Sequence, residues 1–183
     1  MCIRDRNIND QIWIIGSNAS DSSIGASSYL EYFHGLVTGR PPKIDLQDEK
    51  CCQSFLRDAI LKNYIVSSHD VSDGGLAVAL SECCILSSKG ANIQLEDKND
   101  RIDSLLFSEG GSRIIFSVNK KEEQNFSNFL EIKSKDFGSN VYVKKIGFVS
   151  EHNLDITLQD QTLCHLRVDE LTEKFNNSIS NCF

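Results

Sequence analysis

Two periodicities meet in residues 64–88, YIVSSHDVSDGGLAVALSECCILSS. Ile65 and Val66 begin a β-prone run that ends in polar residues at His69 and Asp70. Apolar residues then recur at the helical spacing i, i+3, i+4, i+7 and i+8, namely Leu76, Ala79, Leu80, Cys83 and Cys84. We therefore predict a buried strand, a tight glycine turn and a mostly apolar helix.

The junction between this strand and this helix is open to two interpretations. A helix N-terminus offers backbone N–H groups and a positive dipole end to phosphate, and Gly74 and Gly75 allow a close approach of a ligand or another backbone. Asp70 is a hard oxygen ligand for Mg²⁺, which often binds through one or two carboxylates and substrate phosphates. In the structural alternative, Asp73 caps the helix and Ser72 is a turn residue.

Length and charge restrict the class of protein. The 183 residues suffice for one domain of ordinary size or two very small ones. With 19 basic and 26 acidic residues and no basic run, the net charge of −7 argues against nucleic acid or an anionic membrane as the main partner. No apolar run approaches the roughly 20 residues of a bilayer span, and the N-terminus has no signal-peptide core.

The seven cysteines include two adjacent pairs, Cys51-Cys52 and Cys83-Cys84, and none has zinc-site spacing. Cys83 and Cys84 fall on the apolar face of the predicted helix. We expect buried thiols that act as small hydrophobic groups in a reducing compartment.

Outside the central stretch, local patterns predict further helices and strands. Asp45 is a plausible N-cap for a helix over 46–63. The other predicted helices are 29–35, 102–107, 121–132 and 168–176. The predicted strands are 12–15, 91–96, 114–118, 141–149 (interrupted at Gly147) and a hairpin of 154–158 with 162–166; a charged turn covers 97–100. Helix, strand and helix in close succession predict the α/β class, with a mixed sheet flanked by helices.

The start of the chain is polar and without pattern, so we expect residues 1–10 to be a disordered or non-native start. Residues 11–183 are then a single domain. The strand at 12–15 has almost nothing before it and needs partners from later in the sequence or from another chain. We therefore expect the chain to be a fragment of a longer polypeptide.

A second polar segment, Glu109 to Arg113, precedes the strand at 114–118. A carboxylate, two glycines, a hydroxyl and a guanidinium could hold a polar ligand, but a plain turn is favoured, with Arg113 paired to a carboxylate at the core edge. The four histidines share no local spacing, and a structural role at the strand end is expected for His69.

Four stretches in order resemble one family. HDVSDGGLAVALSE, residues 69–82, resembles the signature of phosphoribosylformylglycinamidine synthase, whose halves are similar to aminoimidazole ribonucleotide synthetase. The stretches that agree with it are 24–29, IGASSY; 35–46, GLVTGRPPKIDL; and 106–109, LFSE, followed by Ser112-Arg113. The resemblance covers roughly residues 12–149. It implies the C-terminal domain of the second repeat, with the fold of the aminoimidazole ribonucleotide synthetase C-terminal domain.

The resemblance implies a function that this piece cannot perform alone. The family is an ATP-dependent carbon–nitrogen ligase of purine biosynthesis, which converts formylglycinamide ribonucleotide to formylglycinamidine ribonucleotide with ammonia from glutamine. It implies ATP and Mg²⁺ as cofactors, the N-terminal domains of the same enzyme and a glutaminase subunit or domain as partners, and a cytoplasmic location.

The resemblance also implies site residues. Carried over, Asp70 is the metal ligand and Ser72, Gly74 and Gly75 contact the nucleotide; no catalytic residue is assigned. Glu109 is a weak substrate candidate, because Gly110-Gly111 stands where the first-repeat pattern has glutamine.

Two other functions stay open. One is another ATP-dependent enzyme of the same superfamily, such as aminoimidazole ribonucleotide synthetase, selenophosphate synthetase or a hydrogenase-maturation protein, although these carry different residues between the aspartate and the Gly-Leu pair. The other is a structural or auxiliary nucleotide-binding module, or a non-enzymatic assembly or interaction domain that kept the fold and lost the site. Nucleotide binding would separate this last case from the synthase domain.

Overall fold

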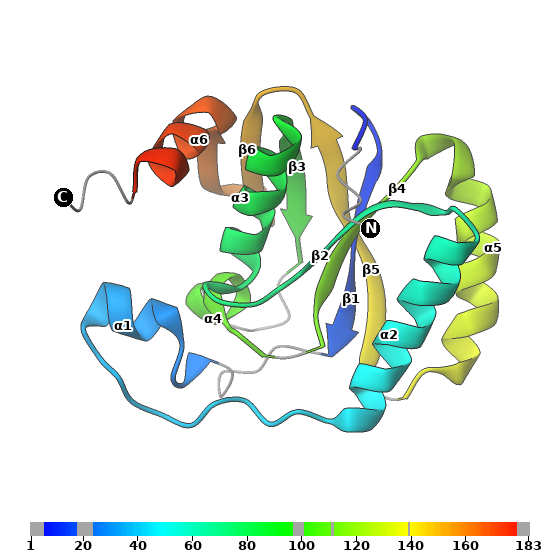
Figure 1. Cartoon of the computed structure of the whole chain (residues 1–183), viewed down its shortest axis with the longest axis horizontal. Coiled ribbons are helices and arrows are strands. Elements are labelled where there is room, and N and C mark those ends of the chain that lie inside the picture. The colour runs from blue at the N-terminus through cyan, green and yellow to red at the C-terminus, as the bar shows by residue number, and fades with distance from the viewer. Residues whose placement is uncertain (1–5, 18–23, 97–100, 111, 139, 179–183) are drawn as a thin grey trace.

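A seven-stranded mixed sheet runs through the molecule in the order β2-β4-β1-β5-β3-β6-β7 (Figure 1). The computed structural model describes residues 6–17, 24–96, 101–110, 112–138 and 140–178. β3 and β6 are parallel, and the other neighbours are antiparallel. The strands are β1 (Gln11–Ser17), β2 (Ile65–Asp70), β3 (Gly90–Leu95), β4 (Ile114–Val118), β5 (Val141–Ser150), β6 (Asn153–Leu158) and β7 (Gln161–Arg167). The predicted α/β class with a mixed sheet is confirmed.

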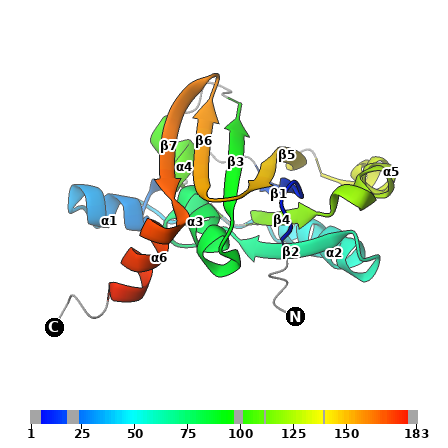
Figure 2. The same ribbon diagram turned by 90° about the horizontal axis from the view of Figure 1, so that it is seen from above.

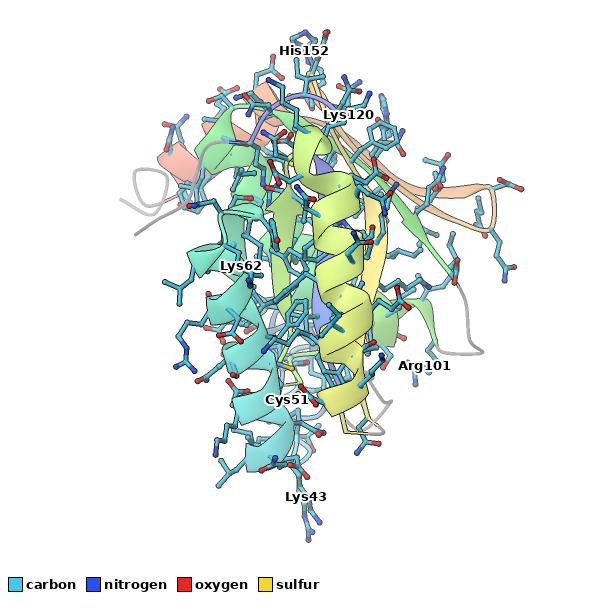
Figure 3. The ribbon with its side chains drawn as sticks, turned by 90° about the vertical axis from the view of Figure 1, so that its right-hand side faces the viewer. Lys43, Cys51, Lys62, Arg101, Lys120 and His152 are labelled. Carbon is cyan, nitrogen blue, oxygen red and sulfur yellow. The ribbon has the colours of Figure 1, made fainter. Side chains whose placement is uncertain are left out.

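Helices cover both faces of this sheet. α2 (Leu46–Leu61) and α5 (Glu123–Lys133) lie side by side on one face (Figure 3). The other helices are α1 (Ser28–His34), α3 (Gly75–Ser87), α4 (Ile102–Phe107) and α6 (Val168–Asn177), with short 3₁₀ turns at Lys120–Glu122 and Ser134–Asp136. α3, α4 and α6 contribute to the core on the opposite face.

Each face has its own apolar core because β1 is buried on both sides. Ile12 and Ile14 belong to the core under α3, whereas Ile15 belongs to the core under α2 and α5. In the second core Phe55 packs against Phe116, Phe126 and Phe129. β1 pairs with β4 and β5, so its partners do come from later in the sequence.

Local signals account for the ends of several elements. The Asp45 side chain accepts hydrogen bonds from the N–H groups of Gln47 and Asp48, which confirms the predicted cap of α2. Gln159 and Asp160, both with positive φ, make the two-residue turn of the β6–β7 hairpin. The predicted turn at 97–100 lies outside the described residues.

Three predicted details are wrong. β2 is an edge strand with only partial burial, whereas the sequence suggested a buried strand. β5 continues through Gly147, because the extra residue Ile146 is taken up as a register shift opposite Ile12 and Trp13. The helix predicted from Lys121 begins as a 3₁₀ turn and becomes α-helical at Glu123.

The twist of the sheet separates its two ends. Figure 2 shows β3, β6 and β7 running in a different direction from β2 and β4. The C-terminal end of β2 lies near α4 and α1 (Figure 1). This end is where the polar junction of the sequence lies.

Two further predictions concern the start of the chain and the thiols. Of the predicted disordered start, residues 1–5 lie outside the described part, while Arg6 and Asp10 are buried and Arg6 Nε donates to Ser67 Oγ at 3.0 Å. The domain boundary at residue 11 stays a prediction. The five described cysteines are free, and burial raises the pKa of Cys52 and of Cys84 to about 12, as expected of inert thiols in the core.

No helix in the described part of the chain combines the length and apolar character that a bilayer-spanning segment needs.

Candidate functional site: the turn between β2 and α3

Two left-handed glycines form the turn that joins β2 to α3. Gly74 has φ 79° and Gly75 φ 70°, a region that other residues rarely adopt. The Gly75 N–H donates to the Ser72 carbonyl at 3.0 Å, and the Val71 N–H donates to the Arg113 carbonyl at 2.9 Å. The buried Val71 side chain anchors the segment, so the polar residues on either side of it are held at the surface.

Gly75 is required by packing as well as by its backbone angle. A Cβ at this position would lie 2.7 Å from the Cα and carbonyl carbon of Phe107 and 2.8 Å from the Leu106 oxygen. The last turn of α4 therefore sits directly against the first residue of α3. The close approach that the glycine permits is an approach of the protein's own backbone.

Asp70, Ser72 and Asp73 are exposed at this turn. The Asp70 side chain is 78% exposed, and its nearest ionic partner is His69 Nδ1 at 3.8 Å. In the described part of the chain, no hydrogen bond ties the side chains of Ser72 and Asp73. The N-cap of α3 is Gly74, without a side-chain hydrogen bond. The interpretation of Asp73 as the cap is therefore wrong.

His69 links the end of β2 to α3. Its Nδ1 donates to the Asp70 carbonyl at 2.7 Å, and its Nε2 lies 3.2 Å from Glu82 Oε2. Both ring nitrogens thus have partners within the protein. The structural role expected for His69 is confirmed, and the imidazole fixes the backbone that carries the Asp70 carboxylate.

Glu109 joins three segments that are far apart in the sequence. Its Oε1 accepts hydrogen bonds from the Gly74 N–H and from the Ser28 N–H, each at 2.8 Å. The carboxylate thus connects the start of α1, the turn before α3 and the loop after α4. The sequence suggested only a ligand contact or a turn at Glu109. The occurrence of all three segments in one family pattern is the signal that could have placed them together.

The rest of the second polar segment folds back on itself. The buried Arg113 donates through Nη2 to the Ser108 carbonyl and through Nε to the Gly110 carbonyl at 3.3 Å. Burial lowers the pKa of the Arg113 guanidinium. Pairing of Arg113 with a carboxylate is therefore wrong, because backbone carbonyls take that place. Ser112 Oγ donates to Glu49 Oε2 of α2.

The charges at the turn decide what it can bind. Asp70, Asp73 and Glu82 make this surface acidic, which disfavours a bare polyphosphate. Among the described residues, no group of three or more His, Cys, Asp or Glu side chains could hold a metal ion. The exposed Asp70 carboxylate, near the Ser72 hydroxyl in the sequence, fits a Mg²⁺ ion that takes its other ligands from phosphate and water.

The link through Glu109 predicts a measurable loss of stability. In Glu109→Gln, an amide oxygen replaces a charged acceptor of two backbone N–H groups, so we expect the free energy of unfolding to fall by about 1–2 kcal/mol. Urea denaturation of the chain measures this. Glu131→Gln, on the exposed side of α5, is the matched control and should stay within about 0.5 kcal/mol of the parent. Equal stability of the two variants would contradict the structural role of Glu109.

Residues 7–152 match the family model described as "AIR synthase related protein, C-terminal domain". Over 178 residues the chain is 90% identical to phosphoribosylformylglycinamidine synthase subunit PurL of Prochlorococcus marinus subsp. pastoris, covering 97% of this chain and 23% of that protein. Identity to PurL of P. marinus strain MIT 9313 is 42%. The chain thus spans less than a quarter of the length of these curated relatives.

Solved structures share the fold. Thermotoga maritima PurL complexed with FGAR superposes with a TM-score of 0.75 at 18% identity, over 91% of this chain and 28% of that one. A HypE–HypF complex gives a TM-score of 0.60 at 16% identity, over 90% and 55%. At such identities the likeness concerns the fold alone.

Proposed function

The chain belongs to the family of AIR synthase related proteins, C-terminal domain, and from this premise we propose that it is the C-terminal domain of the second repeat of a phosphoribosylformylglycinamidine synthase. The observation that carries the proposal is the 90% identity over 97% of the chain to a protein of that name. That relative is roughly four times as long as the 178 residues that match, so we assign the activity to the longer polypeptide.

The proposed reaction is the ATP-dependent conversion of formylglycinamide ribonucleotide to formylglycinamidine ribonucleotide. ATP activates the amide oxygen as an iminophosphate, and ammonia released from glutamine displaces phosphate. T. maritima PurL, which shares the fold, has been solved in complexes with ATP, ADP, AMPPCP and FGAR. These ligands support the proposal that the longer polypeptide handles the same two substrates.

In this proposal the turn between β2 and α3 holds the Mg²⁺-bound nucleotide. The Asp70 carboxylate would bind Mg²⁺ and the Ser72 hydroxyl would contact a phosphate, because both side chains are exposed and uncommitted. When bound, Mg²⁺ neutralises phosphate charge. Gly74 and Gly75 would act by fixing the left-handed turn, because their N–H groups donate to Glu109 and to the Ser72 carbonyl and the Phe107 backbone fills the space beside Gly75.

The residues that surround the turn would act by positioning. Glu109 is engaged with two backbone N–H groups, so in the proposal it shapes the turn and makes no substrate contact. Two surface clefts lie away from the turn. One is lined by His152 and Arg167, and the other by Lys145 and Asp160. The turn itself is an open surface, which another domain would cover.

The proposed partners follow from the whole enzyme. The N-terminal domains of the same polypeptide would carry the rest of the substrate site, and a glutaminase subunit or domain would supply ammonia. The proposed location is the cytoplasm, where purine precursors are made. The net charge of −7 is in keeping with the absence of nucleic acid or membrane surface from this list of partners.

A second candidate is a structural or auxiliary nucleotide-binding module that takes no part in turnover. Glu109 is tied to the backbone, and Gly110-Gly111 offers no side chains where the first-repeat pattern has a glutamine, so this loop has little left with which to hold a substrate. A HypE–HypF complex and the thiamine-monophosphate kinase of Stenotrophomonas maltophilia share the fold alone, at TM-scores of 0.60 and 0.52.

The proposal predicts that the isolated chain has no synthase activity. A chimera, in which this chain replaces the matching region of the P. marinus subsp. pastoris PurL protein, should form formylglycinamidine ribonucleotide from its ribonucleotide substrate, Mg-ATP and ammonium chloride. The chain alone should not exceed the no-enzyme background, because most of the polypeptide is missing. Turnover by the isolated chain, or a folded but inactive chimera beside an active parent, would contradict the proposal.

A further inference from the structure

The segment between β1 and α2 carries exposed apolar side chains away from the sheet. We call residues 28–45, which comprise α1 and the connection to α2, the arm. α1 has no buried residue, and residues 31–41 are all exposed. Figure 1 shows the arm passing beside α4 and below the sheet, and in Figure 3 Lys43 projects beyond the start of α2.

The exposed side chains of the arm are large and close to one another in the sequence. Val37 is 86% exposed, Tyr32 84% and Phe33 75%, with Leu36 at 50%. Tyr32 and Leu36, and likewise Phe33 and Val37, are four residues apart. Aromatic and aliphatic groups gathered in this way on a folded surface mark a protein interface.

The arm is held against the rest of the domain by contacts near its N-terminal end. The Tyr29 ring stacks on Phe107 with 4.7 Å between ring centroids and 2° between planes. The Ala26 N–H donates to the Thr38 carbonyl at 2.8 Å, so the middle of the arm is held against the residues just before it. The Ser28 N–H donates to Glu109. The apolar side chains are thus presented by a backbone that the domain holds in place.

We infer that the arm is the docking surface for another domain of the same longer polypeptide. The inference rests on the proposed function, and the 23% of the relative's length that the chain spans leaves ample polypeptide to supply the partner. The arm also carries charges of both signs, among them Glu31, Arg40 and Lys43, which suit the rim of an apolar protein contact better than a polyanion or a membrane surface.

The position of the arm places a domain docked on it beside the candidate site. The same Glu109 oxygen binds Ser28 at the start of α1 and Gly74 in the turn that carries Ser72. A domain seated on the arm therefore lies beside the open turn. One docked domain would then bury the apolar side chains of the arm and also line the other side of the nucleotide site.

Hydroxyl-radical footprinting tests the inference, because the labelling rate of a side chain follows its exposure. The rates at Tyr32 and Phe33 are compared in the 183-residue chain and in the chimera. We expect both rates to fall at least about fivefold in the chimera, as side chains enter a close-packed interface core. Ile132, 65% exposed on α5, is the control and should keep its rate.

A pair of variants separates docking from an indirect effect. Val37→Asp in the chimera should return the rates at Tyr32 and Phe33 toward those of the isolated chain, whereas Ile132→Asp should not. Unchanged rates between chain and chimera would overturn the inference, as would rates in the isolated chain that fall with protein concentration, which would identify a second copy as the occupant. Synthase turnover, measured on the same chimera, reports separately on the proposed function.

Discussion

Gly75→Ala is expected to lower the free energy of unfolding by about 2–5 kcal/mol. A residue with a Cβ at φ 70° costs about 1–2 kcal/mol. The new methyl group would also lie 2.7 Å from the Phe107 backbone, which cannot rotate away as a side chain would, and such overpacking costs about 1–3 kcal/mol. Urea unfolding of the 183-residue chain, followed by circular dichroism, measures the loss.

Gly35→Ala is the matched control for this prediction. Gly35 also has a left-handed backbone, with φ 63°, but a Cβ there would have no atom within 4 Å. Its expected cost is the backbone term alone, about 1–2 kcal/mol. If both variants lost the same stability, the contact between α4 and the start of α3 would not be what requires glycine at position 75.

Asp70→Asn is expected to weaken the affinity of the chimera for Mg–AMPPCP by about tenfold or more, which is about 1.4 kcal/mol. The amide keeps the size of the side chain but loses the negative charge that strengthens the binding of Mg²⁺. Because the Asp70 side chain is 78% exposed, the free energy of unfolding should change by no more than about 0.5 kcal/mol. Isothermal titration calorimetry measures the affinity.

Two comparisons make the Asp70 result specific. Asp160→Asn, in the exposed hairpin turn between β6 and β7, should bind as the parent does, and asparagine tolerates the positive φ of that position. Without Mg²⁺ the difference between parent and Asp70→Asn should vanish. An unchanged affinity in the presence of Mg²⁺ would remove Asp70 from the site.

Much of the fold could be predicted because its signals are local. The Asp45 cap, the apolar periodicity of α3 and the β6–β7 hairpin are each encoded within a few residues. The edge position of β2 was missed, because strand order depends on pairing between segments tens of residues apart. The continuity of β5 was missed for a similar reason. Gly147 is needed because the neighbouring strand β3 packs close to it: a Cβ there would lie 2.0 Å from the Asn92 oxygen.

The candidate site shows the same division. The turn and its polar residues could be predicted from residues 64–88. The predicted helix cap, Asp73, lies one residue before the observed cap, Gly74. Gly74 and Gly75 both take the left-handed conformation, so α3 starts later than predicted. The contacts of Glu109 span 81 residues to Ser28 and 35 to Gly74. No periodicity or spacing in one sequence encodes such a contact.

We propose that Asp70 and Ser72, held at the surface by the glycine turn, receive a magnesium-bound nucleotide in the longer polypeptide. The most direct measurement is a crystal structure of the chimera with Mg–AMPPCP. We expect a Mg²⁺ ion about 2.0–2.1 Å from an Asp70 carboxylate oxygen, with a phosphate beside Ser72 Oγ. A nucleotide bound elsewhere, with the Asp70 carboxylate still facing solvent, would contradict it.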